Sequence, residues 1–318
     1  MVATACETPC ANLQRARVSA QRVIGVDLGG TKILAGAIDV DGRVLERHEV
    51  PTPTSSQEEL VDGIAAAIEP LAGAGVGAIG LGIPSVIDRR TGRALGSINI
   101  PLTDFSLHDL LGERFGVPIA VENDANVAAL AEWRLGAGKG AANLVLLTLG
   151  TGVGGGVIMD GALYRGWAEL GHVVVVADGP PCQGTCTGRG HLEAVASGSA
   201  ADRAAAKLWG EGATAEILVG RAEEGDPAAL EALAGIGHLL GAAIGSFINI
   251  FAPELTIVGG GFGIAASDFL FSSAHEVAKR EALEPARAGI RIVKAELGSD
   301  AGLIGAGLLA FEAIAQEE

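Results

Sequence analysis

Near the start of this 318-residue chain, the residues best suited to chemistry form a glycine turn with a carboxylate beside it. In the segment D-L-G-G-T-K, which begins at Asp27, Gly29 and Gly30 let backbone N–H groups approach an anion, and Thr31 and Lys32 add further donors. A plain hairpin turn produces the same glycine pair. Asp27 favours a phosphate-binding turn, because a carboxylate at a strand end can hold hydrated Mg²⁺ beside the phosphates.

A second glycine-rich turn, L-G-T-G-V-G-G-G, begins at Leu149 and contains Gly150, Thr151 and Gly152. It does not fit a dinucleotide-binding loop, which opens a helix, because residues 157–161 continue as a strand into an Asp-Gly turn. The sequence G-x-x-x-x-G-K-[ST] of a P-loop is not present in the chain. Phosphate would therefore be held by hairpin turns, an arrangement typical of actin-like ATPase folds.

A third glycine segment, consisting of Gly259, Gly260 and Gly261, follows a buried strand and precedes a helical stretch. Its backbone could lie against a flat base, with the helix N-terminus nearby. An ordinary strand-to-helix turn would have the same sequence.

The segment Glu122–Asn126, E-N-D-A-N, places a carboxylate between two amides where a strand meets a helix. Such a carboxylate could orient a hydroxyl group and take its proton. Asn and Asp are also the preferred residues at a helix start, so the residues alone leave open whether Asp124 is a base or a helix cap.

Two cysteines and two histidines gather in one stretch of a chain that has few of either. Cys182, Cys186 and His191 lie within ten residues, and His172 precedes them, which predicts a closed tetrahedral N₂S₂ site for structural zinc. Two alternatives remain: buried cysteines beside unrelated histidines, or a four-cysteine site in which Cys6 and Cys10 join Cys182 and Cys186.

The elements that must position these residues alternate between strands and helices. Hydrophobic periodicity and turn residues predict strands over 23–27, 33–39, 44–50, 78–83, 119–122, 144–149, 154–159 and 255–258. They predict helices over 56–71, 107–115, from Asp124 to about 136, 200–208, 227–251, 266–282 and 301–315. A strand, a glycine turn, a strand and an Asp-Gly turn occur in this order near residue 23 and again near residue 144, which indicates a duplicated unit.

This pattern predicts two α/β lobes with a cleft between them. We expect a smaller lobe over 22–122 plus 301–318, a larger lobe with the zinc loop over 123–300, and an unstructured extension over 1–21. A net charge of −16 and a pI near 4.8 argue against nucleic acid as a partner. No uninterrupted strongly apolar run of about 18 residues is present, so no membrane association is expected. The few cysteines fit a reducing cytoplasm.

These motifs together resemble the ROK family of sugar kinases and sugar-responsive regulators. The resemblance extends from Val23 to about Leu308 and rests on D-L-G-G-T-K, on E-N-D-A-N, on Leu149 through His172, on the cysteine loop and on G-G-G-F at 259–262. The cysteine loop departs from the usual family sequence C-x-C-G-x-x-G-C, because it has C-x-x-x-C and His191 in place of the last cysteine. Ser85 stands where the family commonly has glycine near the sugar, which could narrow sugar specificity.

The resemblance implies two actin-like, ribonuclease H-like lobes and transfer of a phosphoryl group from ATP to the 6-hydroxyl of a hexose, with glucose as the first choice. It implies that Asp124 is the general base and that the turn at Gly259–Gly261 binds adenosine. The other sugar-binding residues that it implies are Asn99, Asn123, Glu169, His172 and Glu193. Relatives are often dimers, so a homodimer or a higher homo-oligomer is expected.

Three alternatives stay open on the sequence. The sugar could be N-acetylmannosamine, fructose or another hexose, and polyphosphate could replace ATP as the donor. A sugar-sensing regulator would need a DNA-binding domain of about 70 to 90 residues ahead of the first glycine turn, where this sequence has 22 residues before Val23.

Overall fold

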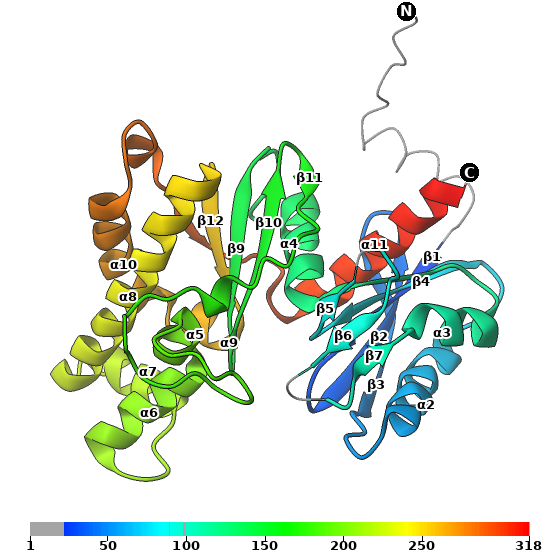
Figure 1. The fold of residues 1–318 in the computed structure, drawn as a ribbon, viewed down its shortest axis with the longest axis horizontal. Coiled ribbons are helices and arrows are strands. Elements are labelled where there is room, and N and C mark those ends of the chain that lie inside the picture. The colour runs from blue at the N-terminus through cyan, green and yellow to red at the C-terminus, as the bar shows by residue number, and fades with distance from the viewer. Residues whose placement is uncertain (1–21, 89, 98–99, 318) are drawn as a thin grey trace, which may run out of the picture. The chain divides into compact units, whose positions relative to one another are not determined.

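The structure is a computed structural model that describes residues 22–88, 90–97 and 100–317. It contains two compact units (Figure 1): the chain up to Ala131 with Asp300–Glu318, and Glu132–Ser299. The chain therefore passes from the first unit to the second inside helix α4 (Asp124–Leu135), whereas the sequence placed this boundary at 122/123. Asp124 consequently belongs to the first unit.

The first unit is built on a five-stranded sheet in which three antiparallel strands are followed by two parallel ones. Its order is β3 (Val44–Pro51), β2 (Lys32–Asp39), β1 (Arg22–Leu28), β4 (Val76–Ile83) and β8 (Ile119–Asn123). The central strands β1 and β4 are almost continuously apolar and buried, whereas the edge strand β3 alternates with exposed charged residues.

The second unit repeats this arrangement. Its order is β11 (Ala162–Leu163), β10 (Val153–Met159), β9 (Leu144–Leu149), β12 (Leu255–Gly259) and β13 (Ile292–Lys294). Its first three strands are also antiparallel and its last two are parallel. The duplication predicted from the sequence is therefore present in the strand order and directions of both sheets.

Helices α2 (Gln57–Ile68), α3 (Leu107–Phe115) and α11 (Ala301–Glu317) belong to the first unit. Helices α2 and α3 each begin at an N-cap serine. The side chains of Ser56 and Ser106 accept hydrogen bonds from the backbone N–H three residues later in the chain. Helix α11 packs against β1 and β4. This contact needs glycine in the sheet, since a Cβ at Gly80 would lie 1.9 Å from the carbonyl oxygen of Ala306.

The helices of the second unit gather around the long α8 (Pro227–Phe251), which packs along α10 (Ser267–Glu281). The others are α5 (Leu192–Ala196), α6 (Gly198–Trp209), α7 (Ala215–Glu223) and α9 (Gly261–Ala265). Short 3₁₀ turns occur at Glu69–Leu71, Leu170–His172, Ala286–Gly289 and Gly298–Asp300. Helix α8 and the segment 298–315 are long and apolar enough to span a bilayer, but more than half of each lies buried in the fold, as in a core helix.

The sequence did not predict the small three-stranded sheet of the first unit or helix α7. The small sheet contains β5 (Val86–Ile87), β6 (Ala94–Gly96) and β7 (Thr103–Phe105), and strands this short leave almost no periodic signal. No element was predicted between 208 and 227, although the buried residues Leu218, Val219 and Ala222 of α7 join the core of the second unit.

Candidate active site and metal centre

The first glycine turn closes the hairpin between β1 and β2. The Gly29 N–H donates to the Lys32 carbonyl over 3.0 Å, and the Thr52 hydroxyl donates to the Gly29 carbonyl over 2.7 Å. Gly30 and Thr31 form the exposed tip. The Lys32 ammonium group lies 2.8 Å from the Glu49 carboxylate on β3. The turn is therefore fixed at its base by these hydrogen bonds, and its tip faces solvent.

Asp27 lies on β1, two residues before the turn. Burial raises its pKa from 3.8 to about 6, and the nearby charge of Lys32 acts in the opposite direction. The carboxylate lies against α11, where a Cβ at Gly302 would come within 2.7 Å of one carboxylate oxygen. A desolvated carboxylate in this position gains by binding a cation, which would replace the lost water.

The E-N-D-A-N segment joins β8 to α4, and its hydrogen bonds show which of its residues caps the helix. The Asn123 side-chain oxygen accepts from the backbone N–H groups of Ala125 at 2.9 Å and Asn126 at 3.1 Å, so Asn123 caps the helix. Asp124 is the first residue of α4, is partly buried, and accepts from the Ala125 N–H at 2.8 Å. The Glu122 carboxylate is fully buried and accepts from the Asn123 N–H and the Asn126 amide.

Two further residues of the first unit bear on the predicted sugar site. Asn99 lies outside the residues that the structure describes. Ser85 is buried, at 4% exposure, and its hydroxyl donates to the Gly96 carbonyl over 2.8 Å. The Ser85 hydroxyl therefore ties the segment between β4 and β5 to the end of β6.

The second glycine turn lies between β9 and β10. The Gly150 N–H donates to the Gly152 carbonyl over 3.0 Å, and the Thr151 carbonyl accepts from the Ser199 hydroxyl over 2.9 Å. A Cβ at Gly152 would lie 2.3 Å from a Glu193 carboxylate oxygen, so a side chain there would displace Glu193. The same carboxylate oxygen accepts from the Val153 N–H over 3.0 Å.

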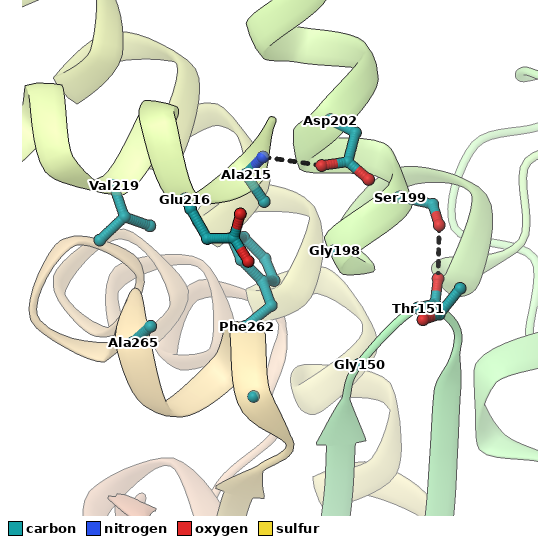
Figure 2. Close-up of a pocket in the computed structure, with 11 residues that line it drawn as sticks. Gly150, Thr151, Gly198, Ser199, Asp202, Ala215, Glu216, Val219, Phe262 and Ala265 are labelled. Atoms are coloured by element: carbon teal, nitrogen blue, oxygen red, sulfur yellow. Dashed lines mark hydrogen bonds between the residues drawn. The ribbon is translucent and has the colours of Figure 1, made fainter. Parts of the chain in front are cut away.

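A pocket of about 490 Å³ opens beside this turn (Figure 2). It is lined by Gly150, Thr151, Gly198, Ser199, Asp202, Ala215, Glu216, Val219, Gly261, Phe262 and Ala265. The pocket thus brings together Gly150, Thr151 and Gly261 of the predicted nucleotide-binding residues. Gly259 ends β12, and Gly260 has a φ of 79° and packs so closely on Leu149 that a Cβ would lie 2.5 Å from its carbonyl oxygen.

Sequence reasoning missed the helical side of this pocket. Asp202 on α6 accepts from the Ala215 N–H at the start of α7 over 2.7 Å, and Glu216 is the second residue of α7. Neither carboxylate belongs to a recognisable motif. The one signal that could have indicated Asp202 is its hydrogen bond to the first turn of α7. Recognising that signal requires knowing that α7 exists.

The four predicted metal ligands come together in the second unit, and all are partly buried. Their ligand atoms all lie within 4.8 Å of one another. The two histidine Nδ1 atoms are 3.2 Å apart, Cys186 Sγ lies 3.6 Å from His191 Nδ1, and each cysteine sulfur lies 3.8 Å from His172 Nδ1. A tetrahedral zinc ion would separate two nitrogens by about 3.3 Å and a nitrogen from a sulfur by about 3.6 Å.

The donor set and its spacing therefore fit a closed tetrahedral metal site. Cys6 and Cys10, the alternative ligands, lie outside the described residues. Burial raises the pKa of the Cys182 thiol to about 11, and a bound cation would favour the thiolate instead.

Hydrogen bonds connect the metal cluster to the second glycine turn. The Gln183 side-chain amide lies between Cys182 and Cys186 in sequence and donates to the Thr151 carbonyl at 3.3 Å and the Ser197 hydroxyl at 3.0 Å. Glu193 follows the cluster, and its second carboxylate oxygen is 3.7 Å from Cys182 Sγ.

Glu169, at the start of the 3₁₀ turn that carries His172, has its pKa raised mainly by burial and also by Glu193, against the lowering effect of His172. Of the predicted sugar-binding residues, His172 is therefore a member of the cluster, and Glu169 and Glu193 lie beside it.

The ROK family model matches residues 23–313, almost the whole described part of the chain. This chain belongs to the ROK family. This match confirms the resemblance to the ROK family that was based on the glycine turns, E-N-D-A-N and the cysteine loop. The family membership also confirms the actin-like two-lobe fold class.

Among its ROK relatives, the chain is 37% identical to a glucokinase of Streptomyces coelicolor, with 91% of this chain and 97% of the relative covered. It is 33% identical to an N-acetylmannosamine kinase of Escherichia coli O157:H7, with 90% of this chain and 97% of that enzyme covered. A solved ROK glucokinase from Streptomyces griseus, in complex with glucose and AMPPNP, has a TM-score of 0.79 and 36% identity, with 91% and 99% covered.

Proposed function

We propose that this ROK protein is an ATP-dependent hexose kinase that phosphorylates the 6-hydroxyl of glucose. The observation that carries the proposal is that the second glycine turn opens into a pocket of about 490 Å³, a volume typical of small-molecule sites, in a chain similar to glucokinases over nine-tenths of its length. The ATP analogue and glucose in the Streptomyces griseus structure support both substrates.

In the proposed reaction, the 6-hydroxyl oxygen of the sugar bonds to the γ-phosphorus of ATP while the bond to the β,γ-bridging oxygen breaks. Asp124 takes the hydroxyl proton, and ADP leaves. The position of Asp124 at the first residue of α4 supports this role, because the helix N-terminus favours the ionised carboxylate that a base requires. Asn123 fixes the start of this helix and so fixes Asp124.

The remaining residues have positioning roles in this proposal. The sugar hydroxyls would be bound by Asn99, Asn123, Asp124, Glu169, His172 and Glu193. The donor phosphates would be held by the turn at Gly29–Lys32 and the turn at Gly150–Gly152, and the adenosine by the segment Gly259–Gly261. Backbone N–H groups in such turns suit phosphate oxygens.

The residues present also fit two metal ions. Asp27 would hold Mg²⁺, which supplies charge neutralisation on the phosphate chain when bound. His172, Cys182, Cys186 and His191 would hold structural zinc, since four ligands leave no open position for a substrate. Because Gln183 and Glu193 connect this cluster to the second glycine turn, the zinc site would set the shape of that turn.

A kinase for N-acetylmannosamine is a second candidate, favoured by the 33% identity to such an enzyme. The deciding experiment is a coupled ADP-release assay with ATP and Mg²⁺ on glucose, N-acetylmannosamine, fructose and mannose, followed by NMR identification of the product. We expect glucose to have the highest kcat/KM and glucose 6-phosphate to be the product. Release of ADP on none of these sugars would refute the kinase proposal, and a preference for N-acetylmannosamine would replace glucose as the substrate.

We further propose that the protein acts in the cytoplasm, where glucose and ATP meet, and that it forms a homo-oligomer, as expected from the resemblance. Size-exclusion chromatography with light scattering measures the second directly. A monomer at micromolar concentration would contradict it.

A further inference from the structure

The pocket beside the second glycine turn has two chemically different sides. Ala215, Val219, Phe262 and Ala265 provide apolar surface from α7 and α9. The opposite side is backbone and hydroxyl, from Gly150, Thr151, Gly198 and Ser199. A flat ring with polar edges can satisfy both sides at once, whereas a chain of phosphates has no apolar surface to place against the first side.

Two carboxylates add to this asymmetry. Asp202 and Glu216 are the charged residues of the lining, and no lysine or arginine occurs among the lining residues within the described part of the chain. Figure 2 shows Asp202 on α6 and Glu216 on the first turn of α7, both beside the pocket. One oxygen of Asp202 accepts from the Ala215 N–H, which holds the carboxylate in place, and Glu216 lies 3.3 Å from the Thr214 hydroxyl.

We propose that Asp202 and Glu216 select the phosphoryl donor: they accept hydrogen bonds from the hydroxyl and amino groups of a nucleoside and repel inorganic polyphosphate. This inference rests on the proposed kinase function and deepens it. A ribose hydroxyl or a base amino group is a donor that a carboxylate acceptor binds well. A polyphosphate oxygen in the same place is an anion facing two anions.

The size of the effect follows from Coulomb's law. Two unit charges about 8 Å apart change a binding constant by about twofold in water and by about thirtyfold at the effective dielectric constant of about 20 near a protein surface. Because Glu216 is exposed and salt screens its charge over about 8 Å, neutralising it should improve polyphosphate use by a factor nearer the lower figure, about two- to tenfold. The same change removes a charge-assisted hydrogen bond to the nucleoside and should raise the KM for ATP by about tenfold with kcat nearly unchanged.

The experiment compares ATP, tripolyphosphate and long-chain polyphosphate as donors for glucose phosphorylation by the full chain. The variants are Asp202→Asn, Glu216→Gln and Glu216→Lys, and Glu223→Gln is the matched control, an exposed glutamate on the same helix α7 outside the pocket lining. Adenosine binding is measured in parallel by calorimetry. Circular dichroism verifies that each variant folds.

We expect the natural chain to use ATP at least a hundredfold better than either polyphosphate, and this ratio to fall in Glu216→Gln and further in Glu216→Lys. Equal use of ATP and polyphosphate by the natural chain, or Glu216 variants that behave like Glu223→Gln, would overturn the inference. If no donor supports turnover, the kinase proposal fails. In that case adenosine binding that Glu216→Gln weakens and Glu223→Gln does not would still support nucleoside selection, and equal binding would overturn it.

Discussion

Replacing Glu132 with alanine should lower the free energy of unfolding by about 3 to 4.5 kcal/mol. This side chain on α4 is 0% exposed, and its carboxylate accepts three backbone hydrogen bonds. One oxygen accepts from the Leu297 N–H at 2.7 Å, and the other accepts from the N–H groups of Ala137 at 2.9 Å and Glu296 at 3.2 Å. At about 1 to 1.5 kcal/mol for each bond lost from a buried carboxylate, the sum is the stated range.

Two variants make this prediction specific. Glu132→Gln keeps the size and one acceptor oxygen, but its NH₂ group must face at least one N–H donor, so about half of the loss is expected. Glu254 is the matched control, because it accepts from the N–H groups of Ala142 at 2.6 Å and Asn143 at 3.1 Å but is exposed. Water can replace its carboxylate, and Glu254→Ala should cost less than about 1 kcal/mol.

The measurement is urea-induced unfolding followed by circular dichroism and tryptophan fluorescence, fitted with one transition for each unit. Only the transition of the second unit should shift in Glu132→Ala, since Glu132 and its three partners all belong to that unit. If Glu132→Ala lowers the free energy of unfolding no more than Glu254→Ala does, the reasoning that burial makes these three hydrogen bonds strongly stabilising is wrong.

Asp124→Asn should lower kcat by about 10²- to 10⁴-fold while glucose binding stays within about tenfold. The control is Asp109→Asn, on the first turn of α3. Near-normal turnover of Asp124→Asn would show that Asp124 is not the base. Replacing Cys182 and Cys186 with serine should abolish bound zinc in elemental analysis and lower Tm, and natural protein purified without zinc would disprove the site. The pKa of Asp27 is about 6 in the folded protein and near 3.8 in the unfolded chain, so the folded state holds this proton more tightly. The free energy of unfolding should therefore fall by up to about 3 kcal/mol as pH rises from 3.8 to 6. Asp27→Asn should flatten this part of the profile of stability against pH.

Where local chemistry decides an element, the sequence was sufficient. The bounds of α3 and α8 agree with the prediction, because Ser106 and Gly116 cap α3 and the pair Asp226-Pro227 starts α8. The metal cluster was also predictable, because its ligands lie close together along the chain and few cysteines and histidines compete with them.

Where packing between distant segments decides, the sequence was not sufficient. Asp202 and Glu216 line the pocket only because α6 and α7 pack side by side, and nothing within either segment indicates this. Asn123 was expected to bind sugar and is also a helix cap, a role that E-N-D-A-N allows for either Asn123 or Asp124. Side-chain geometry, rather than composition, decides between the two.

The matching sheets place Asp27 and Thr148 at corresponding positions. Each precedes a leucine and a glycine turn, and each pairs with a glycine of the next parallel strand, Asp27 with Gly82 and Thr148 with Gly259. Only the sheet of the first unit therefore carries an acid at this position, while the sheet of the second unit carries a hydroxyl. At this strand end a cation could be bound by a carboxylate in the first unit alone, although both sheets have the same strand order.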